Sequence, residues 1–249
     1  MSDNHLLRSQ APITSAGWEL LDEEARERLV VALAARRLVD FGGPHGWQHS
    51  ATNLGRTEPI AAAPCEDVTA RRRRILPLAE LRAPFTVARE ELRDGDRGAA
   101  DVDLAELDAA ARRMAVAENK AVLHGWAQAG MRGITEVSPH PTLPRSEDFD
   151  EYPGYVAKAV ELLRRSGIGG PYALALGTDD YTGVIETAEH GGYPLFDHLA
   201  QILGGPIVWS PGVDGAIVLS QRGGDFLFES GQDLAVGYDH HDADAVHLY

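Results

Sequence analysis

Cysteine is nearly absent from this chain, and long hydrophobic runs are missing altogether. Cys65 is the single cysteine among 249 residues, which excludes an internal disulfide framework and a metal cage made only of cysteines. No apolar stretch approaches the roughly 18 residues that a membrane-spanning helix needs, and the N-terminus lacks the apolar centre of a signal peptide. We therefore expect neither membrane insertion nor secretion, and a reducing cytoplasm suits the lone thiol.

Positive charge is also scarce. The chain has 23 lysines and arginines against 38 aspartates and glutamates, which gives a formal net charge of −15. A surface this acidic repels phosphate backbones, so we expect no nucleic-acid partner. One basic run, Arg71 to Arg74, is expected to face solvent or to pair with carboxylates across a subunit contact.

The signatures of the common enzyme classes are missing as well. The chain has no G-x-x-x-x-G-K-[ST] loop, no G-x-S-x-G elbow, no H-E-x-x-H motif and no E-x-x-H pair of the di-iron type. The glycine-rich residues 167–170 precede an expected strand, whereas a phosphate cradle precedes a helix, so they are interpreted as a turn.

A stretch rich in histidine and aspartate near the C-terminus keeps one alternative open. Residues 239–247 contain His240, His241 and His247 together with three aspartates, and such side chains can hold a divalent ion. Neighbouring residues of a strand point to opposite faces, however, so His240 and His241 cannot both reach one ion. We interpret the stretch as a solvated acidic turn and retain a small metal-dependent enzyme as the alternative function.

Hydrophobic spacing predicts helices and strands in separate blocks, which is typical of an α+β fold. A first helix should begin at Thr14 or Ser15 and stop before Gly42, and residues 45–77 have the composition of an extended hairpin. A strand is expected over 81–87 and a spine helix over 103–129. A hairpin of this length favours contact with a neighbouring subunit, because long loops in compact domains usually serve a function.

The second half of the chain alternates between the two kinds of element. We expect helices at 155–165, 179–188 and 194–203. We expect strands, with antiparallel pairing, at 172–176, 207–209, 216–220, 226–228, 234–238 and 245–249.

Six short motifs occur along the chain in a fixed order. The most specific is Arg222-Gly223-Gly224-Asp225-Phe226, followed by Gly231-Gln232-Asp233-Leu234. The other five lie within residues 11–18, 36–47, 77–86, 170–172 and 190–194. Together these motifs resemble the encapsulins, a family of shell proteins also known as linocin-like bacteriocins, and the resemblance covers nearly the whole chain.

The resemblance implies the α+β fold of tailed-phage major capsid proteins (Hong Kong 97-like), with a peripheral domain, an axial domain and an extended arm loop. Members of the family close into a hollow icosahedral compartment of about sixty copies, or a multiple, around a cargo enzyme. The chain would then be a shell subunit and not an enzyme. Its cargo would be a ferritin-like iron oxidase or a dye-decolourising peroxidase, its role iron storage or oxidative-stress defence, and its subunit would carry no cofactor or metal.

On this basis the chain divides into five parts. They are an N-terminal helical part facing the interior (1–47), the extended arm (48–80), the peripheral domain with its spine helix (81–133), the axial domain (134–222), and strands that return to the peripheral domain (223–249).

The resemblance also implies two functional regions. The cargo's C-terminal docking peptide is expected in an interior groove, at positions matched by Leu29, Leu33, Leu38, Asp40, Leu234 and Val236. Leu29 and Leu33 equally suit the core face of the first helix. The five-fold pore, which gates small molecules, is matched by Glu189, His190, Gly191, Gly192 and Tyr193. The family usually has a single glycine before the Tyr-Pro pair, so its pore width is not carried over.

Two departures from the family pattern affect these expectations. Some members bind a flavin through a tryptophan at the position of Glu90, and a glutamate cannot stack on an isoalloxazine ring, so no flavin is expected. The family also continues past the position of Tyr249 with a further strand. Either the sequence is a shortened form or that pairing is missing, and the second case would leave an open sheet edge.

Overall fold

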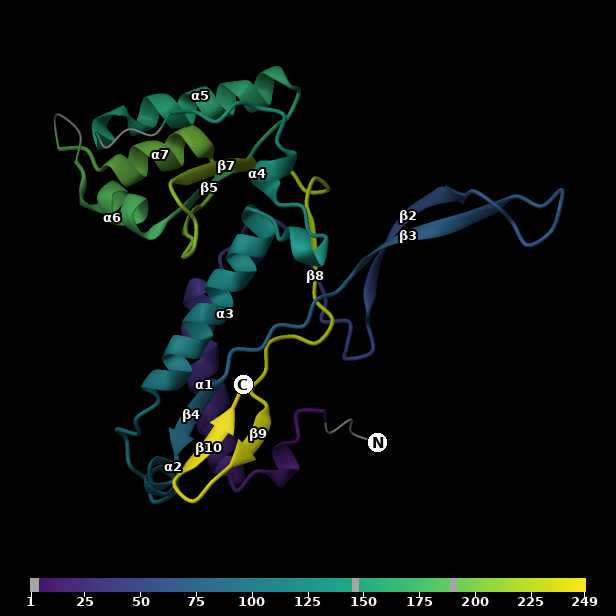
Figure 1. The fold of residues 1–249 in the computed structure, drawn as a ribbon. Coiled ribbons are helices and arrows are strands. Elements are labelled where there is room, and N and C mark those ends of the chain that lie inside the picture. The colour runs from purple at the N-terminus through teal and green to yellow at the C-terminus, as the bar shows by residue number, and fades with distance from the viewer. Residues whose placement is uncertain (1–4, 145–147, 189–191) are drawn as a thin grey trace.

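Two lobes and a hairpin arm make up the computed structural model, which describes residues 5–144, 148–188 and 192–249 (Figure 1). The first, which we call the helical lobe, contains α1 (Ser15–Ala32), α2 (Arg89–Asp96), α3 (Ala105–Leu123), β4 (Phe85–Ala88), β9 (Tyr238–His241) and β10 (Ala245–Leu248). The second, the sheet lobe, contains α5 (Tyr152–Arg165), α6 (Thr178–Glu186), α7 (Leu195–Leu203), β5 (Tyr172–Leu176), β6 (Ile207–Trp209) and β7 (Ala216–Ser220).

The helical lobe forms around the contact between α1 and α3. The Thr14 side chain caps α1 by accepting a hydrogen bond from the Gly17 N–H at 3.0 Å, which confirms the expected start of the helix. Leu21 and Ala25 turn inward and share a core with residues of the β4-β10-β9 sheet, in which β10 lies between the other two strands. The lobe thus joins segments from both ends of the chain.

The end of α1 differs from the expectation. The helix stops at Ala32, not near Gly42, because the fully buried Asn119 side chain binds the chain at this point. Asn119 Oδ1 accepts hydrogen bonds from the backbone N–H groups of Ala34 and Ala35, each at 3.0 Å, and Nδ2 donates to the carbonyls of Ala32 and Pro211. An amide from α3 therefore replaces the bonds that the next helical turn would make.

The spine helix α3 is also shorter than expected. It ends at Leu123, where Gly125 takes a φ of +91°, and the Cβ of any other residue there would come within 2.2 Å of Glu136 Oε2. Helix α2 was not foreseen, since its sequence is highly charged and buries one residue, Leu92.

The sheet lobe has its core between the β6-β5-β7 sheet and three helices. All five residues of β5 are buried, and β5, β6 and β7 lie at the expected positions. Pairing between β5 and β6 is parallel, so the expectation of antiparallel pairing was wrong there. Helices α6 and α7 lie between β5 and β6 in the chain and supply the crossover connection that a parallel pair requires.

The arm is an antiparallel hairpin of β2 (Ala51–Ile60) and β3 (Ala70–Pro77), as the composition of this stretch predicts. It leaves the molecule between the two lobes and projects away from both (Figure 1). Its side chains are mostly exposed, including the apolar Ile60, Val68 and Ile75.

A joint connects the lobes beside the root of the arm. There β1 (Asp40–Gly42) pairs in parallel with β8 (Leu227–Glu229). A third hydrophobic core, which includes Leu38, Leu123 and Val208, contains residues from both lobes.

The remaining short helices are η1 (Arg8–Gln10), η2 (Ala35–Arg37), η3 (Ala127–Ala129), α4 (Ile134–Val137) and η4 (Phe149–Glu151).

Two expected strands are displaced. Regular pairing in the first begins at Phe85 rather than Leu81. The second begins at Tyr238, and residues 234–237 form no strand. Arg8 binds the Val236 carbonyl and Arg36 binds the Asp233 carboxylate, which holds this segment out of the sheet.

Among the helices of the described residues, none combines the length and apolar character needed to cross a membrane.

Candidate functional site

The segment 233–236 runs alongside α1, and two arginines fix its course. Beyond the C-terminal end of α1, Arg36 Nη1 contacts Asp233 Oδ1 at 2.7 Å. Towards the other end of the helix, Arg8 Nε donates to the Val236 carbonyl at 2.8 Å while its Nη groups bind the Asp22 carboxylate. The expected docking region of a cargo peptide is therefore built from α1 and this irregular segment.

Arg36 is the electrostatic centre of this region. Its guanidinium makes two hydrogen bonds of 2.8 Å to the buried carboxylate of Glu118 and lies 4.7 Å from the centre of the Phe41 ring. Burial alone would lower the pKa of Arg36, but the bonds and charge of Glu118, followed by those of Asp233, outweigh it and raise the pKa. The group stays charged and holds α3, η2 and the segment 233–236 together.

The structure divides the six expected docking residues into two sets. Leu29, Leu33 and Leu234 are half-buried and Asp40 is exposed, so their side chains are accessible at the surface. Leu38 and Val236 are only 2% and 5% exposed and belong to hydrophobic cores. These two residues support the docking region through core packing, and their side chains are not accessible to a peptide.

The Arg222-Gly223-Gly224-Asp225 motif forms a tight turn that binds Asp40. Both glycines have a φ near +80°, the left-handed region that favours glycine. The Gly224 N–H donates to Asp40 Oδ2 at 2.6 Å, and Arg222 closes the turn through two bonds to Asp225, which hold the pKa of that carboxyl below its ordinary value. A hollow of about 270 Å³ lies here, lined by Leu38, Asp40, Phe226 and their neighbours.

Two of the five expected pore residues can be placed. Tyr193 is 42% exposed, and its hydroxyl accepts a hydrogen bond from Gln201 Nε2 of α7 at 2.8 Å. Gly192 has open space around the position of a Cβ and a φ of +80°. Ala188 and Pro194 form an antiparallel bridge pair. Glu189, His190 and Gly191 lie outside the described residues.

The histidines near the C-terminus do not converge on one point. His240 and His247 face each other across β9 and β10 with ring centres 4.1 Å apart, and each contacts an aspartate, Asp239 and Asp242 respectively. His241 instead interacts through Nδ1 with the Tyr238 hydroxyl at 2.6 Å. Adjacent histidines thus point to opposite faces, as their position on a strand predicts, and the three do not form one ligand set.

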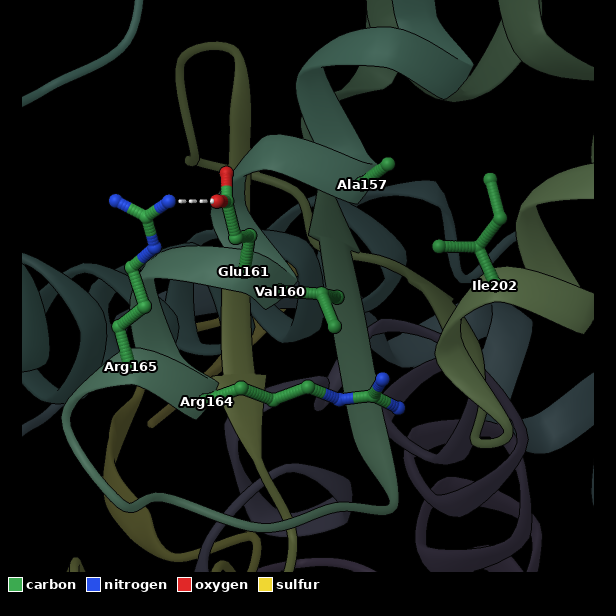
Figure 2. A pocket seen from close by; sticks show the side chains of 6 residues that line it. All are labelled: Ala157, Val160, Glu161, Arg164, Arg165 and Ile202. Atoms are coloured by element: carbon green, nitrogen blue, oxygen red, sulfur yellow. Dashed lines mark ion pairs between the residues drawn. The ribbon is translucent and has the colours of Figure 1, made fainter.

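A hollow of about 420 Å³ lies between α5 and α7 (Figure 2). Its one carboxylate, Glu161, is paired with Arg165 at 2.6 Å, while Arg164 extends over the Tyr172 ring. The six lining residues therefore offer the Glu161–Arg165 ion pair, the Arg164 guanidinium and three apolar side chains, and none of them is a nucleophile with an adjacent base.

Glu90, where the resemblance implies a flavin-binding tryptophan in some family members, is paired with two arginines of α2 and its C-terminal cap. Hydrogen bonds from Arg93 and then Arg97 hold the pKa of its carboxyl below the ordinary value. The side chain is an ion-paired surface group of α2, and the prediction that this chain binds no flavin rests on that residue type.

Comparison with known proteins supports the shell interpretation. The family model described as "Encapsulating protein for peroxidase" matches residues 3–249. A type 1 encapsulin shell protein from Rhodospirillum rubrum is 47% identical over 251 aligned residues, which cover 99% of this chain and 90% of the relative. Another, from Rhodococcus erythropolis, is 41% identical, with 98% of this chain and 92% of the relative covered.

A solved virus-like particle protein from Pyrococcus furiosus shares the fold, with a TM-score of 0.65, 17% identity, and coverage of 93% of this chain and 90% of that chain. The expected capsid-like α+β fold is confirmed. The relatives are named as shell proteins and not as enzymes, which sets the metal-dependent enzyme aside. This chain belongs to the family of encapsulating proteins that includes the type 1 encapsulin shell proteins.

Proposed function

We propose that this protein is the subunit of a closed icosahedral shell, built from about sixty copies or a multiple, that encloses a cargo enzyme. The family and the capsid-like fold support assembly into a particle. The cargo would be a ferritin-like iron oxidase or a dye-decolourising peroxidase, and the shell would serve iron storage or oxidative-stress defence in the cytoplasm.

The observation that carries the proposal is the unsupported arm. A hairpin of this length that projects from its own body, with exposed apolar residues such as Val68 (57%) and Ile75 (53%), leaves apolar surface in water unless another subunit covers it. Between residues 51 and 77 the chain has five arginines and three carboxylates, although its overall charge is −15. A basic arm and an acidic body are electrostatically complementary, which favours contact between copies.

Charge reversal in the arm tests assembly. Arg73 and Arg74 are exposed on β3, and the matched control residues Arg112 and Arg132 are exposed in the body. We expect Arg73→Glu with Arg74→Glu to reduce the yield of particles and the pair Arg112→Glu with Arg132→Glu to preserve it, as measured by mass photometry and negative-stain electron microscopy. A wild-type protein that stays monomeric, or an arm variant that assembles like the control, would contradict the proposal.

Cargo docking is assigned to the accessible leucines beside α1. An extended peptide binds through alternate apolar side chains in shallow pockets, which Leu29, Leu33 and Leu234 suit. Replacing Leu33, just past the end of α1, by Gln should lower the cargo content of shells purified from the organism's own cells without reducing their number. Val30→Gln, at a nearby exposed position within α1, should leave the cargo content unchanged. Mass spectrometry of the same particles identifies the cargo, and equal cargo in both variants would refute this docking region.

The loop between α6 and α7 is assigned to the pore. This stretch of the sequence contains Glu189, His190, Gly191, Gly192 and Tyr193, and Tyr193 is exposed. Substitution of Tyr193 by Phe removes the contact with Gln201 and should alter the rate at which ions enter the shell, measured as the uptake of Fe²⁺ by enclosed oxidase. The same rate in both proteins would argue against this assignment.

A further inference from the structure

Three side chains capable of binding a metal meet at the root of the arm, beside the pairing of β1 with β8. His45 Nε2 lies 3.8 Å from Glu229 Oε1, and His49 Nε2 lies 3.9 Å from Glu229 Oε2. The two imidazole rings are 4.7 Å apart between centres, and one ligand atom from each of the three residues falls within 4.8 Å of the others. In the described part of the chain, no other group of three such side chains reaches this spacing.

The backbone builds this arrangement. The strand pairing of β1 with β8 sets Gly42 opposite Glu229, and beyond it the Ser230 N–H donates to the Gly42 carbonyl at 2.9 Å. The His45 N–H then donates to the Ser230 carbonyl at 3.0 Å, so the His45 backbone is bound to the residue that follows Glu229. The close approach depends on Gly43, where a Cβ would lie 2.4 Å from the Ser230 oxygen.

The second histidine is brought back by a turn. The His49 N–H donates to the Gly46 carbonyl at 3.1 Å, and the Gly46 N–H donates to the Gly231 carbonyl at 2.9 Å. His49 Nε2 is buried and has no hydrogen-bond partner. All three ligands are therefore positioned by hydrogen-bonded backbone before any ion arrives, which lowers the entropy lost on binding.

The separations suit an ion better than a direct contact. At 3.8 and 3.9 Å the nitrogen–oxygen pairs are too long for hydrogen bonds. A tetrahedral ion with bonds of about 2.1 Å holds its ligand atoms roughly 3.4 Å apart, so small side-chain rotations complete the geometry. Two imidazoles and one carboxylate form a ligand set typical of zinc and related transition ions.

We propose that His45, His49 and Glu229 bind one divalent transition-metal ion of the Zn²⁺ class, which ties the root of the arm to β8. Since β2 begins two residues after His49, the ion fixes the direction in which the arm leaves the body. A water molecule completes the coordination. The proposal goes beyond the shell function, and binding can be measured whether or not particles form.

Metal titration of the purified full-length protein tests the site. After removal of metals with a chelator, ZnCl₂ alone is titrated by calorimetry, and CoCl₂ is titrated separately to observe the visible absorption of a tetrahedral cobalt complex. We expect one ion per chain. His49→Gln and Glu229→Gln retain similar side-chain volume but each removes a direct ligand. Loss of an outer-shell partner costs roughly 10- to 100-fold in metal affinity, so the affinity of these variants for Zn²⁺ should fall further than that.

The matched control is His240→Gln, which removes a histidine from the other closely spaced pair and should leave the affinity unchanged. Circular dichroism confirms folding of each variant. Resistance of the arm to limited proteolysis should increase with Zn²⁺ in the wild type and the control only. Binding that persists in both site variants, loss of binding only in the control, or a wild type that takes up no ion at micromolar Zn²⁺ would overturn the proposal.

Discussion

At the scale of single residues, Asn119 decides where the first helix ends. Its amide is fully buried and makes four hydrogen bonds to backbone groups, three of them in residues 32–35 and the fourth at Pro211. The same four backbone groups lose their partners when the amide is removed, and water cannot reach them. An asparagine in the middle of a helix is ordinarily unremarkable in a sequence, which is why the expected helix ran past Ala32.

We predict that Asn119→Ala lowers the free energy of unfolding by about 3 kcal/mol or more, because each buried group left without a partner costs roughly 1–3 kcal/mol. Chemical denaturation of the unassembled subunit measures it. Asn53→Ala is the matched control, since the Asn53 side chain accepts a hydrogen bond from the Gly55 N–H in an exposed part of the arm and its loss should cost far less. Equal costs in both variants would show that Asn119 does not organise the helix end.

The carboxyl group of Asp242 has a pKa lowered to about 2 by backbone hydrogen bonds from Asp244 and Ala245, and next by His247. A folded-state pKa below the unfolded value of about 3.9 means that the ionised form stabilises the fold. This stabilisation is fully present above about pH 4 and is lost as the pH falls through about 2. The melting temperature of Asp242→Asn should therefore lie below that of the wild type at pH 5, and the difference should shrink as the pH approaches 2.

At the scale of elements, glycines within helices show how closely the sheet lobe is packed. A Cβ on Gly183 of α6 would lie 2.0 Å from the Phe149 ring, whereas a Cβ on Gly154 of α5 would meet no atom within 4 Å. The same substitution therefore has opposite consequences in the two helices.

We predict that Gly183→Ala destabilises the protein by about 1–3 kcal/mol through overpacking against Phe149. Gly154→Ala should instead stabilise it by about 0.5–1 kcal/mol, because alanine has the higher helix propensity. Thermal and chemical denaturation of both variants in parallel measure the two effects. A stabilising Gly183→Ala would mean that α6 does not pack against this ring.

The elements that the sequence predicted best are those with local causes. β5, β6 and β7 are short apolar runs bounded by glycine, proline or polar residues, and their bounds were predicted correctly. The segment 234–237 has the same apolar character but forms no strand, because Arg8 and Arg36 bind it from elsewhere in the sequence. Contacts between residues that are far apart in the chain produce no recognisable pattern in the local sequence.

The candidate sites likewise separate into residues that the sequence could indicate and residues whose position depends on distant contacts. Leu29 and Leu33 were found by resemblance and occupy accessible positions, while burial of Leu38 and Val236 could not be predicted without the fold. The possible metal ligands were missed. His45 and His49 have a spacing that could have signalled them, but Glu229 comes near only through the pairing of β1 with β8.

At the scale of the whole molecule, the negative charge determines what a shell can hold. With a net charge of −15 per chain, a shell built from many copies repels polyphosphates strongly. We predict that purified particles contain no nucleic acid. Their absorbance ratio at 260 and 280 nm should be that of protein and should not change after particles are opened and treated with nuclease. Nuclease-sensitive material released on opening would contradict this prediction.

The position of β10 determines when the helical lobe can close its core. This strand lies between β4 and β9, and its buried Val246 and Leu248 complete the core around α1. Because β10 follows β4 far along the chain, the core around α1 stays open during synthesis until β10 has emerged from the ribosome. A chain interrupted before Ala245 would lack the central strand of this sheet, and its α1 core would stay open.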